Sequence, residues 1–205
     1  MQGYIIDIKA VKDDDLIVSI LTESHIYTTY RFYGARHSNI NVGYKIDFEL
    51  ETNMKSSIPR LKDVIQLGFQ WIFDNDKLYC WQRFIKLFYP HLKDVETVDD
   101  FYFKLLDKLS HKMIKQNPKR AICKSYIKLL DYEGRLHTDY HCLLCEQEIK
   151  KDISLVRSFM PVHASCTYSK SFKLKKIKEL YEEKRIISFE DEEVDYLWKI
   201  ILQGL

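Results

Sequence analysis

Two short cysteine and histidine motifs constrain the fold of this chain more than any other sequence feature. The first is Cys142-Leu-Leu-Cys145, and seventeen residues separate it from the second, His163-Ala-Ser-Cys166. Two residues between ligands allow both side chains of a tight turn to point at one ion, and two such turns complete the tetrahedron that zinc prefers. The motifs therefore predict a zinc-knuckle-type site at about 142–166, which ties two separated segments together.

A closed site with four protein ligands leaves no position for water, so the zinc is expected to be structural rather than catalytic. Reduced cysteines in a core are one alternative, and a redox Cys-x-x-Cys pair is another. The expected ligands are Cys142, Cys145, His163 and Cys166. Two nearby histidines, His141 and His137, are alternatives for the fourth position.

The bulk composition indicates a globular protein of one or two domains. The chain has 205 residues, of which 46% are apolar, enough for a sizeable core. Met1–Asp15 lacks the basic and then apolar pattern of a signal peptide, and no run approaches the ~18 apolar residues of a membrane helix. We therefore expect a cytoplasmic location, where cysteines serve metal sites more often than disulfides.

The first part of the chain has the alternating pattern of short β-strands. Apolar residues alternate with polar ones, most clearly where Ile46, Phe48 and Leu50 interrupt a run of charged side chains. Several short strands at this spacing predict a five-stranded, OB-like barrel, which we place at residues 1–57. The expected strands are Tyr4–Ile8, Leu16–Leu21, His25–Tyr33 and Lys45–Glu51.

Helical periodicity begins at about residue 58, which predicts a helical domain at 58–205 and an α+β fold for the whole chain. Pro59 is placed at the start of the first helix, and Asn117 with Pro118 forms a cap followed by proline at the first helical position. The expected helices are 58 to about 73, Trp81–Tyr89, Asp99–Lys115, 117 to about 132, Lys173–Glu183 and Glu190–Leu202.

Positive charge is concentrated in two segments although the net charge of the chain is only +2. No acid occurs from Lys108 to Leu130 or from Tyr168 to Lys178, and such one-sign stripes can follow a phosphate backbone. A solvated helix face is the alternative interpretation. The candidate DNA contacts in these stripes are Lys112, Lys115, Lys119, Arg120, Lys173, Lys175 and Lys176.

The predicted barrel offers a second set of candidate DNA contacts. Base stacking on aromatic rings beside cationic side chains is how OB-type surfaces hold single strands. Alternating aromatic residues in a strand also form cores, so only one of the two faces is available for binding. The cationic candidates are Arg31, Arg36, His37 and Lys45, which lie near Tyr30, Phe32 and Tyr33 in the sequence.

Common catalytic and nucleotide-binding motifs are missing from the sequence. There is no Walker-type phosphate loop, no Gly-x-Gly-x-x-Gly, no Gly-x-Ser-x-Gly and no His-Glu-x-x-His. We therefore expect a protein that is not an enzyme. A protein–protein adaptor stabilised by zinc is the main alternative to DNA binding, and a metal-dependent nuclease is a weaker one.

An acidic turn precedes a strand that ends in Thr22-Glu-Ser-His, and a Gly34-Ala-Arg segment follows. Further on, Leu129-Leu130 leads through Gly134 to the first cysteine motif. Taken together, these segments resemble the RecO family. The chain departs from the family pattern at His25 and Glu146, where glycine is usual, and at His163, where many zinc-bearing members have cysteine.

The resemblance implies a role in DNA repair and recombination after DNA damage. RecO-like proteins bind single- and double-stranded DNA and anneal complementary strands. They act with RecR and single-strand-binding protein to help RecA load onto covered strands, which implies a cytoplasmic, nucleoid-associated protein. By this similarity, Arg31, Arg36 and Lys45 would lie on or near the DNA-binding face of the barrel.

Overall fold

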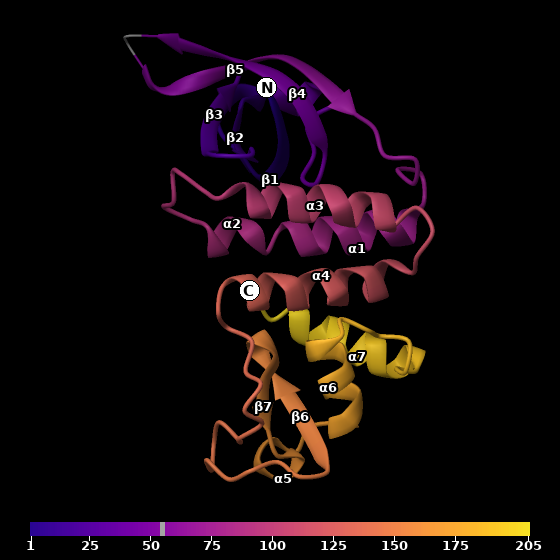
Figure 1. Ribbon diagram of the computed structural model, residues 1–205. Helices are drawn as coiled ribbons and strands as arrows, with labels where there is room; N and C mark the ends of the chain where they lie inside the picture. The colour runs from indigo at the N-terminus through magenta and orange to yellow at the C-terminus, as the bar shows by residue number, and fades with distance from the viewer. Residues whose placement is uncertain (54–55) are drawn as a thin grey trace. The chain divides into compact units, whose positions relative to one another are not determined.

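The chain forms two compact units, which are described one at a time. The computed structural model describes residues 1–53 and 56–205 and divides into Met1–Ile114 and Lys115–Leu205. The first unit contains a barrel followed by helices, and the second contains helices and a small sheet (Figure 1). The expected α+β fold class is confirmed.

A closed five-stranded barrel opens the first unit. Its strand order is β1–β2–β3–β5–β4, and all neighbours are antiparallel except the short parallel pairing of β3 with β5. The expected OB-like barrel is therefore present, and it continues past residue 57. The strands are β1 (Gln2–Ala10), β2 (Leu16–Leu21), β3 (Ile26–Arg31), β4 (Lys45–Asn53) and β5 (Ser56–Leu67).

Alternating residues of the strands fill the barrel interior. In β4, Ile46 and Phe48 are buried whereas Glu49 is exposed, as the sequence pattern predicts. Removing each large aliphatic side chain from water contributes roughly 1.5–3 kcal/mol, and this burial fixes the strand register. The same core includes Ile5, Leu16, Val18, Ile20, Ile40 and Leu61.

The orientation of β3 decides which of its side chains face outward. Thr29 is fully buried, and its hydroxyl donates to the carbonyl oxygen of Val18 at 3.0 Å. Its neighbour Thr28 is exposed, and Phe32, just beyond the strand, is 45% exposed. Because side chains alternate along a strand, the face that carries Thr28 and Tyr30 lies on the outside of the barrel.

The predicted helix from 58 to about 73 is wrong, because Ser56–Leu67 forms strand β5. The pairing of β4 with β5 shifts register near Asp63, which has a left-handed φ of 48°. Such a bulge adds a residue, so Leu61 and Val64 both reach the barrel core although they are three apart. Apolar residues spaced three apart resemble the pattern of a helix, but here the segment pairs with β4 and forms a strand.

Three helices complete the first unit: α1 (Asn75–Ile85), α2 (Phe88–His91) and α3 (Asp100–Lys112). Helix α1 begins earlier than the expected Trp81, because the Asp74 side chain caps it by accepting the Lys77 N–H at 3.1 Å. The fully buried Trp81 indole donates to the Gly43 carbonyl at 2.7 Å, which fastens α1 to the barrel.

The second unit begins with a capped helix and continues into a three-stranded sheet. Asn117 caps α4 as expected, and Gly134 follows the helix with a φ of 67°. The segment between Gly134 and Lys173, for which no regular elements were predicted, contains the sheet β7–β6–β8. The elements are α4 (Pro118–Tyr132), β6 (Asp152–Val156), β7 (Met160–Val162), α5 (Ala164–Thr167), β8 (Ser171–Lys173), α6 (Leu174–Glu182) and α7 (Asp191–Ile201).

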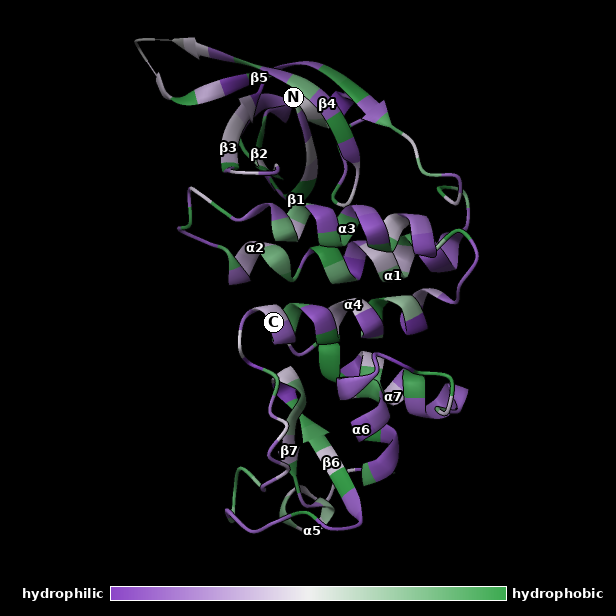
Figure 2. Cartoon of the chain, in the orientation of Figure 1, coloured by the Kyte–Doolittle hydropathy of each residue, from purple (hydrophilic) through white to green (hydrophobic). Residues whose placement is uncertain are grey.

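The second unit has a hydrophobic core of its own. The hydrophobic stretch of β6 and the hydrophobic faces of its helices are visible in Figure 2. The rings of Tyr126 and Phe159 pack edge to face at 4.9 Å, and the Tyr181 hydroxyl donates to the Phe159 carbonyl at 2.8 Å. Because Ile153 and Phe172 are also buried, the sheet is anchored to the helices by ordinary packing.

Candidate metal centre and nucleic-acid surface

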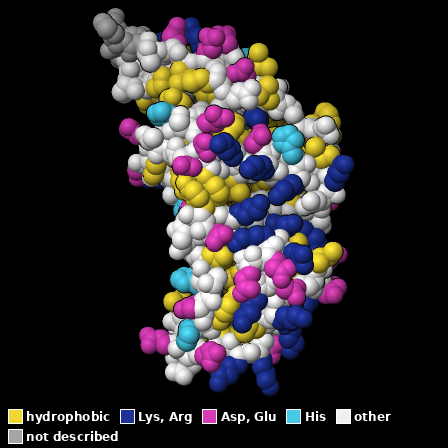
Figure 3. All heavy atoms as spheres, viewed as in Figure 1, with side chains coloured by type: hydrophobic (Ala, Val, Ile, Leu, Met, Phe, Trp, Pro, Cys, Tyr) yellow, Lys and Arg dark blue, Asp and Glu magenta, His cyan; other side chains and the backbone are white. Residues whose placement is uncertain are grey.

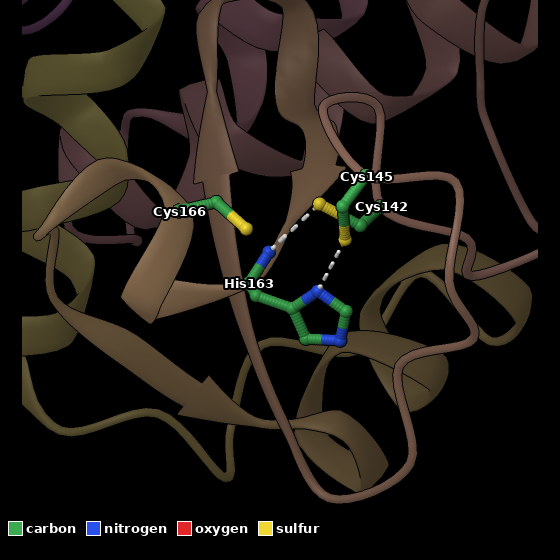
Figure 4. Close-up of side chains that lie close together, drawn as sticks. All are labelled: Cys142, Cys145, His163 and Cys166. Carbon is green, nitrogen blue, oxygen red and sulfur yellow. Dashed lines mark hydrogen bonds between the residues drawn. The ribbon is translucent and has the colours of Figure 1, made fainter.

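The structure brings the two sequence motifs together into one cluster of four donor atoms. The ligand atoms of Cys142, Cys145, His163 and Cys166 all lie within 4.8 Å of one another, and their side chains point toward a common centre (Figure 4). The Sγ of Cys145 lies 3.3 Å from the Nδ1 of His163. The group could therefore hold a metal ion.

Tight backbone turns position the first pair of cysteines. The N–H of Glu146 donates to the Cys142 carbonyl at 2.8 Å, and the N–H of Cys142 donates to the Gln147 carbonyl at 2.9 Å. Glu146 closes the turn in the left-handed region with a φ of 59°. This conformation explains why glycine suits that position, since a residue with a Cβ adopts it at an energetic cost.

The second motif is presented by the end of β7 and by α5. His163 precedes the short helix α5, which carries Cys166, and the Cys166 N–H donates to the His163 carbonyl at 3.0 Å. The backbone N–H of His163 also donates to the Sγ of Cys142 at 3.3 Å. The β6–β7 hairpin thus brings residues that are far apart in sequence to the same point.

The electrostatics of the cluster favour a bound cation. Burial raises the pKa of Cys142, but the N–H donors of His163, Cys145 and Leu144 outweigh it and lower the pKa to about 6. Burial and the neighbouring Cys145 and Cys142 raise the pKa of Cys166. One thiolate therefore forms readily and opposes the ionisation of the next, a conflict that a divalent ion would remove.

The sulfur–nitrogen distance in the cluster agrees with the edge of a tetrahedral metal site. Zinc–sulfur bonds of about 2.3 Å and zinc–nitrogen bonds of about 2.0–2.1 Å imply a sulfur–nitrogen separation of about 3.6 Å. The 3.3 Å between Cys145 and His163 is close to this value. Three thiols and one imidazole form a soft donor set, which zinc prefers to the hard cations calcium and magnesium.

The alternative fourth ligands lie outside the cluster that the structure forms. His141 forms a β-bridge with Glu148, and its Nδ1 lies 3.9 Å from a carboxylate oxygen of Asp139. Together with His137, it lines a cavity of about 430 Å³ beside the cysteine turn. Among the residues that the structure describes, His163 is the histidine that joins the three cysteines.

The barrel presents two exposed aromatic rings, each covered by an arginine. The guanidinium carbon of Arg60 lies 4.7 Å from the ring centre of Phe32, and that of Arg36 lies 4.9 Å from the ring centre of Tyr33. Phe32 and Tyr33 are 45% and 53% exposed. The sequence interpretation missed Arg60 because it assigned this segment to a helix, although the parallel pairing with Tyr30 places it beside β3.

The other cationic candidates on the barrel differ in their availability. Arg31 is half-buried and donates to the Leu61 carbonyl at 2.8 Å, whereas His37 is exposed. The Lys45 ammonium lies 2.7 Å from Asp107 of α3. Burial opposes the charge of Asp107, but the hydrogen bond from Lys45 holds its pKa below the usual value. The charge of Lys45 is therefore largely balanced inside the first unit.

The candidates near the start of α4 also have different surroundings. Arg120 donates to the carbonyls of Ile186 and Phe189 at 2.8 and 2.7 Å and to the carboxylate of Asp191 at 2.8 Å. It therefore holds the connection between α6 and α7. Lys119 forms an ion pair with Asp195, Lys112 is half-buried, and Lys115 is exposed.

Three further candidates lie at the junction of β8 and α6. Lys173 pairs with Asp152 at 2.8 Å, and Lys176 pairs with Glu193 at 2.7 Å. Lys175 is exposed. The structure thus places the predicted DNA contacts in several separate groups.

The first unit is a closed OB-like barrel followed by helices, and the second unit carries a cluster of three cysteines and one histidine. Residues 1–72 match the family model described as RecO N terminal, which covers the whole barrel. The match supports the assignment of the chain to the RecO family. No curated protein matches the chain. Among the described residues, no helix is long and apolar enough to cross a membrane.

The family assignment supports a role in DNA repair and recombination. RecO proteins are non-enzymatic mediators that generally bind DNA and act with partner proteins. In the four-donor cluster, protein ligands would fill all four positions around a tetrahedral ion.

Proposed function

We propose that the chain binds single-stranded DNA on its barrel, anneals complementary strands, and helps RecA load onto strands covered by single-strand-binding protein. RecR is the expected direct partner, the site of action is the cytoplasmic nucleoid, and duplex DNA is a further ligand. The observation that carries this proposal is the pair of exposed aromatic rings covered by arginines, Phe32 with Arg60 and Tyr33 with Arg36.

These pairs suit unpaired bases better than duplex DNA. An unpaired base exposes its π-face and can stack on Phe32 or Tyr33, whereas a duplex hides its bases and offers mainly phosphates. The arginines already lie over the rings and form exposed ion pairs, Arg36 with Asp14 at 2.8 Å and Arg60 with Glu51 at 3.7 Å. Exposed pairs of this kind contribute little, so an incoming phosphate or base can replace them. Arg31 and His37 lie close to these pairs in sequence and are secondary contacts in the proposal, and Lys45 contributes less because Asp107 balances it.

The metal in this proposal is zinc, and its role is structural. Cys142, Cys145, His163 and Cys166 would hold it, and its chemistry would be to neutralise the thiolates and join the two motifs. The zinc would keep the cysteine turn and the β6–β7 hairpin in place without taking part in DNA chemistry.

A protein-docking role is the second candidate, and one observation favours it. Leu143 and Leu144, between the first two cysteines, are 53% and 59% exposed. Adjacent exposed leucines on a rigid turn form an apolar contact for another protein. This role is compatible with DNA binding by the barrel, so the two candidates require separate measurements.

The direct test combines strand annealing with a double substitution on the barrel. Annealing of strands coated with single-strand-binding protein is expected to accelerate when the full chain is added, without nucleotide. Arg36→Gln with Arg60→Gln is expected to weaken single-strand affinity about tenfold and to lower the salt slope by roughly 1.4, at about 0.7 per lost phosphate contact.

The matched control replaces two exposed arginines elsewhere, Arg83→Gln with Arg185→Gln, which changes the net charge equally. Phe32→Ala separately tests stacking, which contributes about 1–3 kcal/mol per base. If the Arg36 and Arg60 double variant and its control lose the same affinity, the barrel face is not the binding surface.

A further inference from the structure

A hollow in the second unit is lined mainly by lysines. Its volume is about 760 Å³, and it lies where the segment before β6, the junction of β8 with α6, and the connection between α6 and α7 meet. Lys and Arg side chains gather along one side of this unit in Figure 3. The lining lysines are Lys150, Lys151, Lys173, Lys175, Lys176 and Lys178, and Glu179 is the one acid among the lining residues.

The positive charge of this lysine hollow is only partly balanced. Three of its lysines pair with acids, and Lys178 lies 5.0 Å from the ring centre of Tyr140. No ion pair is found for Lys151 or Lys175 in residues 1–53 and 56–205. The pairs are Lys150 with Glu148, Lys173 with Asp152 and Lys176 with Glu193. The hollow therefore keeps a net positive charge.

The N-terminus of helix α6 opens into the same hollow. No side chain caps it and its first turn contains no acid, although the Leu174 N–H donates to the Lys151 carbonyl at 2.9 Å. The positive end of a helix dipole usually attracts acidic side chains, but here Lys175 and Lys176 occupy the first turn. The N–H groups of the first turn of α6 and the lysines of that turn are therefore close together. A bound anion would interact favourably with both groups.

A second polar group in the hollow lacks a partner. The Oγ of Ser188 is buried and forms no hydrogen bond with any described residue, and Ser188 lines the hollow. A buried hydroxyl without a partner carries a desolvation cost, and a rotation of the partly exposed Ser188 side chain toward a bound acceptor would offset it. A phosphate oxygen is an acceptor that also matches the lysines and the helix N-terminus.

We infer that the lysine hollow binds the phosphate backbone of a second nucleic-acid strand. This inference rests on the proposed function, because it takes DNA as the ligand of the protein and adds a site separate from the aromatic pairs of the barrel. Lysines contact phosphates as mobile point charges, so the hollow holds a strand without selecting its sequence. With one strand on each unit, a single chain holds both strands that annealing requires.

The test counts strands bound to each full-length chain. A short oligothymidine is titrated against the protein at low salt. The number of oligonucleotides bound per chain is measured by analytical ultracentrifugation and by native mass spectrometry. Two strands are expected for the unmodified protein. Lys151→Gln with Lys175→Gln is chosen because neither lysine loses an ion pair to any described residue, and it is expected to weaken the second binding event roughly tenfold.

Lys93→Gln with Lys199→Gln is the matched control, since it removes two exposed lysines outside the hollow and is expected to bind two strands. Ser188→Ala is expected to weaken the second event without changing net charge. Unchanged binding of two strands by the Lys151 and Lys175 variant would overturn the inference. If the unmodified protein binds only one strand, and Arg36→Gln with Arg60→Gln abolishes that binding, the inference of a second site is overturned. The proposed function is left intact by this result.

A protein that binds no strand at all would remove the proposed function as well. Free inorganic phosphate at millimolar concentration provides a further arm of the test. If phosphate binds the hollow of an unmodified protein that takes only one strand, the hollow holds isolated phosphate ions and the inference of a strand site fails.

Discussion

Removal of the metal is expected to loosen the cysteine segment without unfolding the second unit. The cluster joins the turn at Cys142 to the segment around Cys166, and these segments have only short strands between them. The rest of the unit is held by its own core, in which Tyr126, Phe159 and Phe172 are buried. Chelation therefore acts on residues 141–169, whereas α4, α6 and α7 keep their packing.

The magnitude follows from binding linkage. A metal present at about a thousand times its dissociation constant stabilises the bound state by about 4.1 kcal/mol. The amide groups of 141–169 should therefore exchange with solvent up to about a thousandfold faster after chelation, because local opening no longer has to release the ion. Hydrogen exchange followed by mass spectrometry measures this difference peptide by peptide.

Two substitutions separate metal loss from general damage. Cys142→Ser removes a buried donor of the cluster, so it should reduce metal content below one per chain and reproduce the effect of chelation. Cys80→Ala replaces a buried cysteine of α1 in the first unit and should keep one metal per chain. Equal exchange rates with and without chelator would refute the reasoning, and so would exchange that rises throughout α4 and α7.

Two further predictions concern single residues. Arg120→Ala should lower the free energy of unfolding by about 2 kcal/mol, because it leaves two backbone carbonyls without their donor. Urea denaturation measures this change. An unchanged midpoint would show that these bonds contribute nothing to stability. Asp15 accepts hydrogen bonds from the Tyr30 hydroxyl, which has the larger effect, and from the Tyr33 N–H, and these bonds hold the pKa of Asp15 below 3.8. The carboxylate therefore stabilises the folded barrel fully above about pH 5. This stabilisation is lost as the pH falls through the lowered pKa. Asp15→Asn should therefore flatten the acid side of the stability profile, and a profile parallel to that of the unmodified protein would contradict this assignment.

The sequence predicted the four donors of the cluster because each half of the cluster is local. A turn of two residues between ligands has few conformations, so Cys142 and Cys145 must point the same way. The sequence already favoured His163 over His141, and in the structure the β6–β7 hairpin brings His163 to the cysteine turn. The short strands of this hairpin carry too few residues to show a clear alternation.

The barrel was predicted in its first four strands and missed in its fifth. Strand pairing in β1 to β4 leaves a regular alternation in the sequence, whereas the bulge near Asp63 destroys it in β5. This single error also concealed Arg60, because a helix would not have placed it beside Phe32. The charge stripes predicted positive surfaces, but the roles of the individual residues required the structure. Lys175 is exposed and has no ion pair among the described residues, whereas Arg120 holds the connection between α6 and α7.

The order of strands in the barrel has a consequence for the growing polypeptide. Strands β1, β2 and β3 pair in succession, but their outer edges are covered only when β4 joins β1 and β5 joins β3. Until Leu67 has left the ribosome, a nascent chain therefore presents two unpaired strand edges to its surroundings. Protection against intermolecular strand pairing arrives only with the β4–β5 pair that completes the ring.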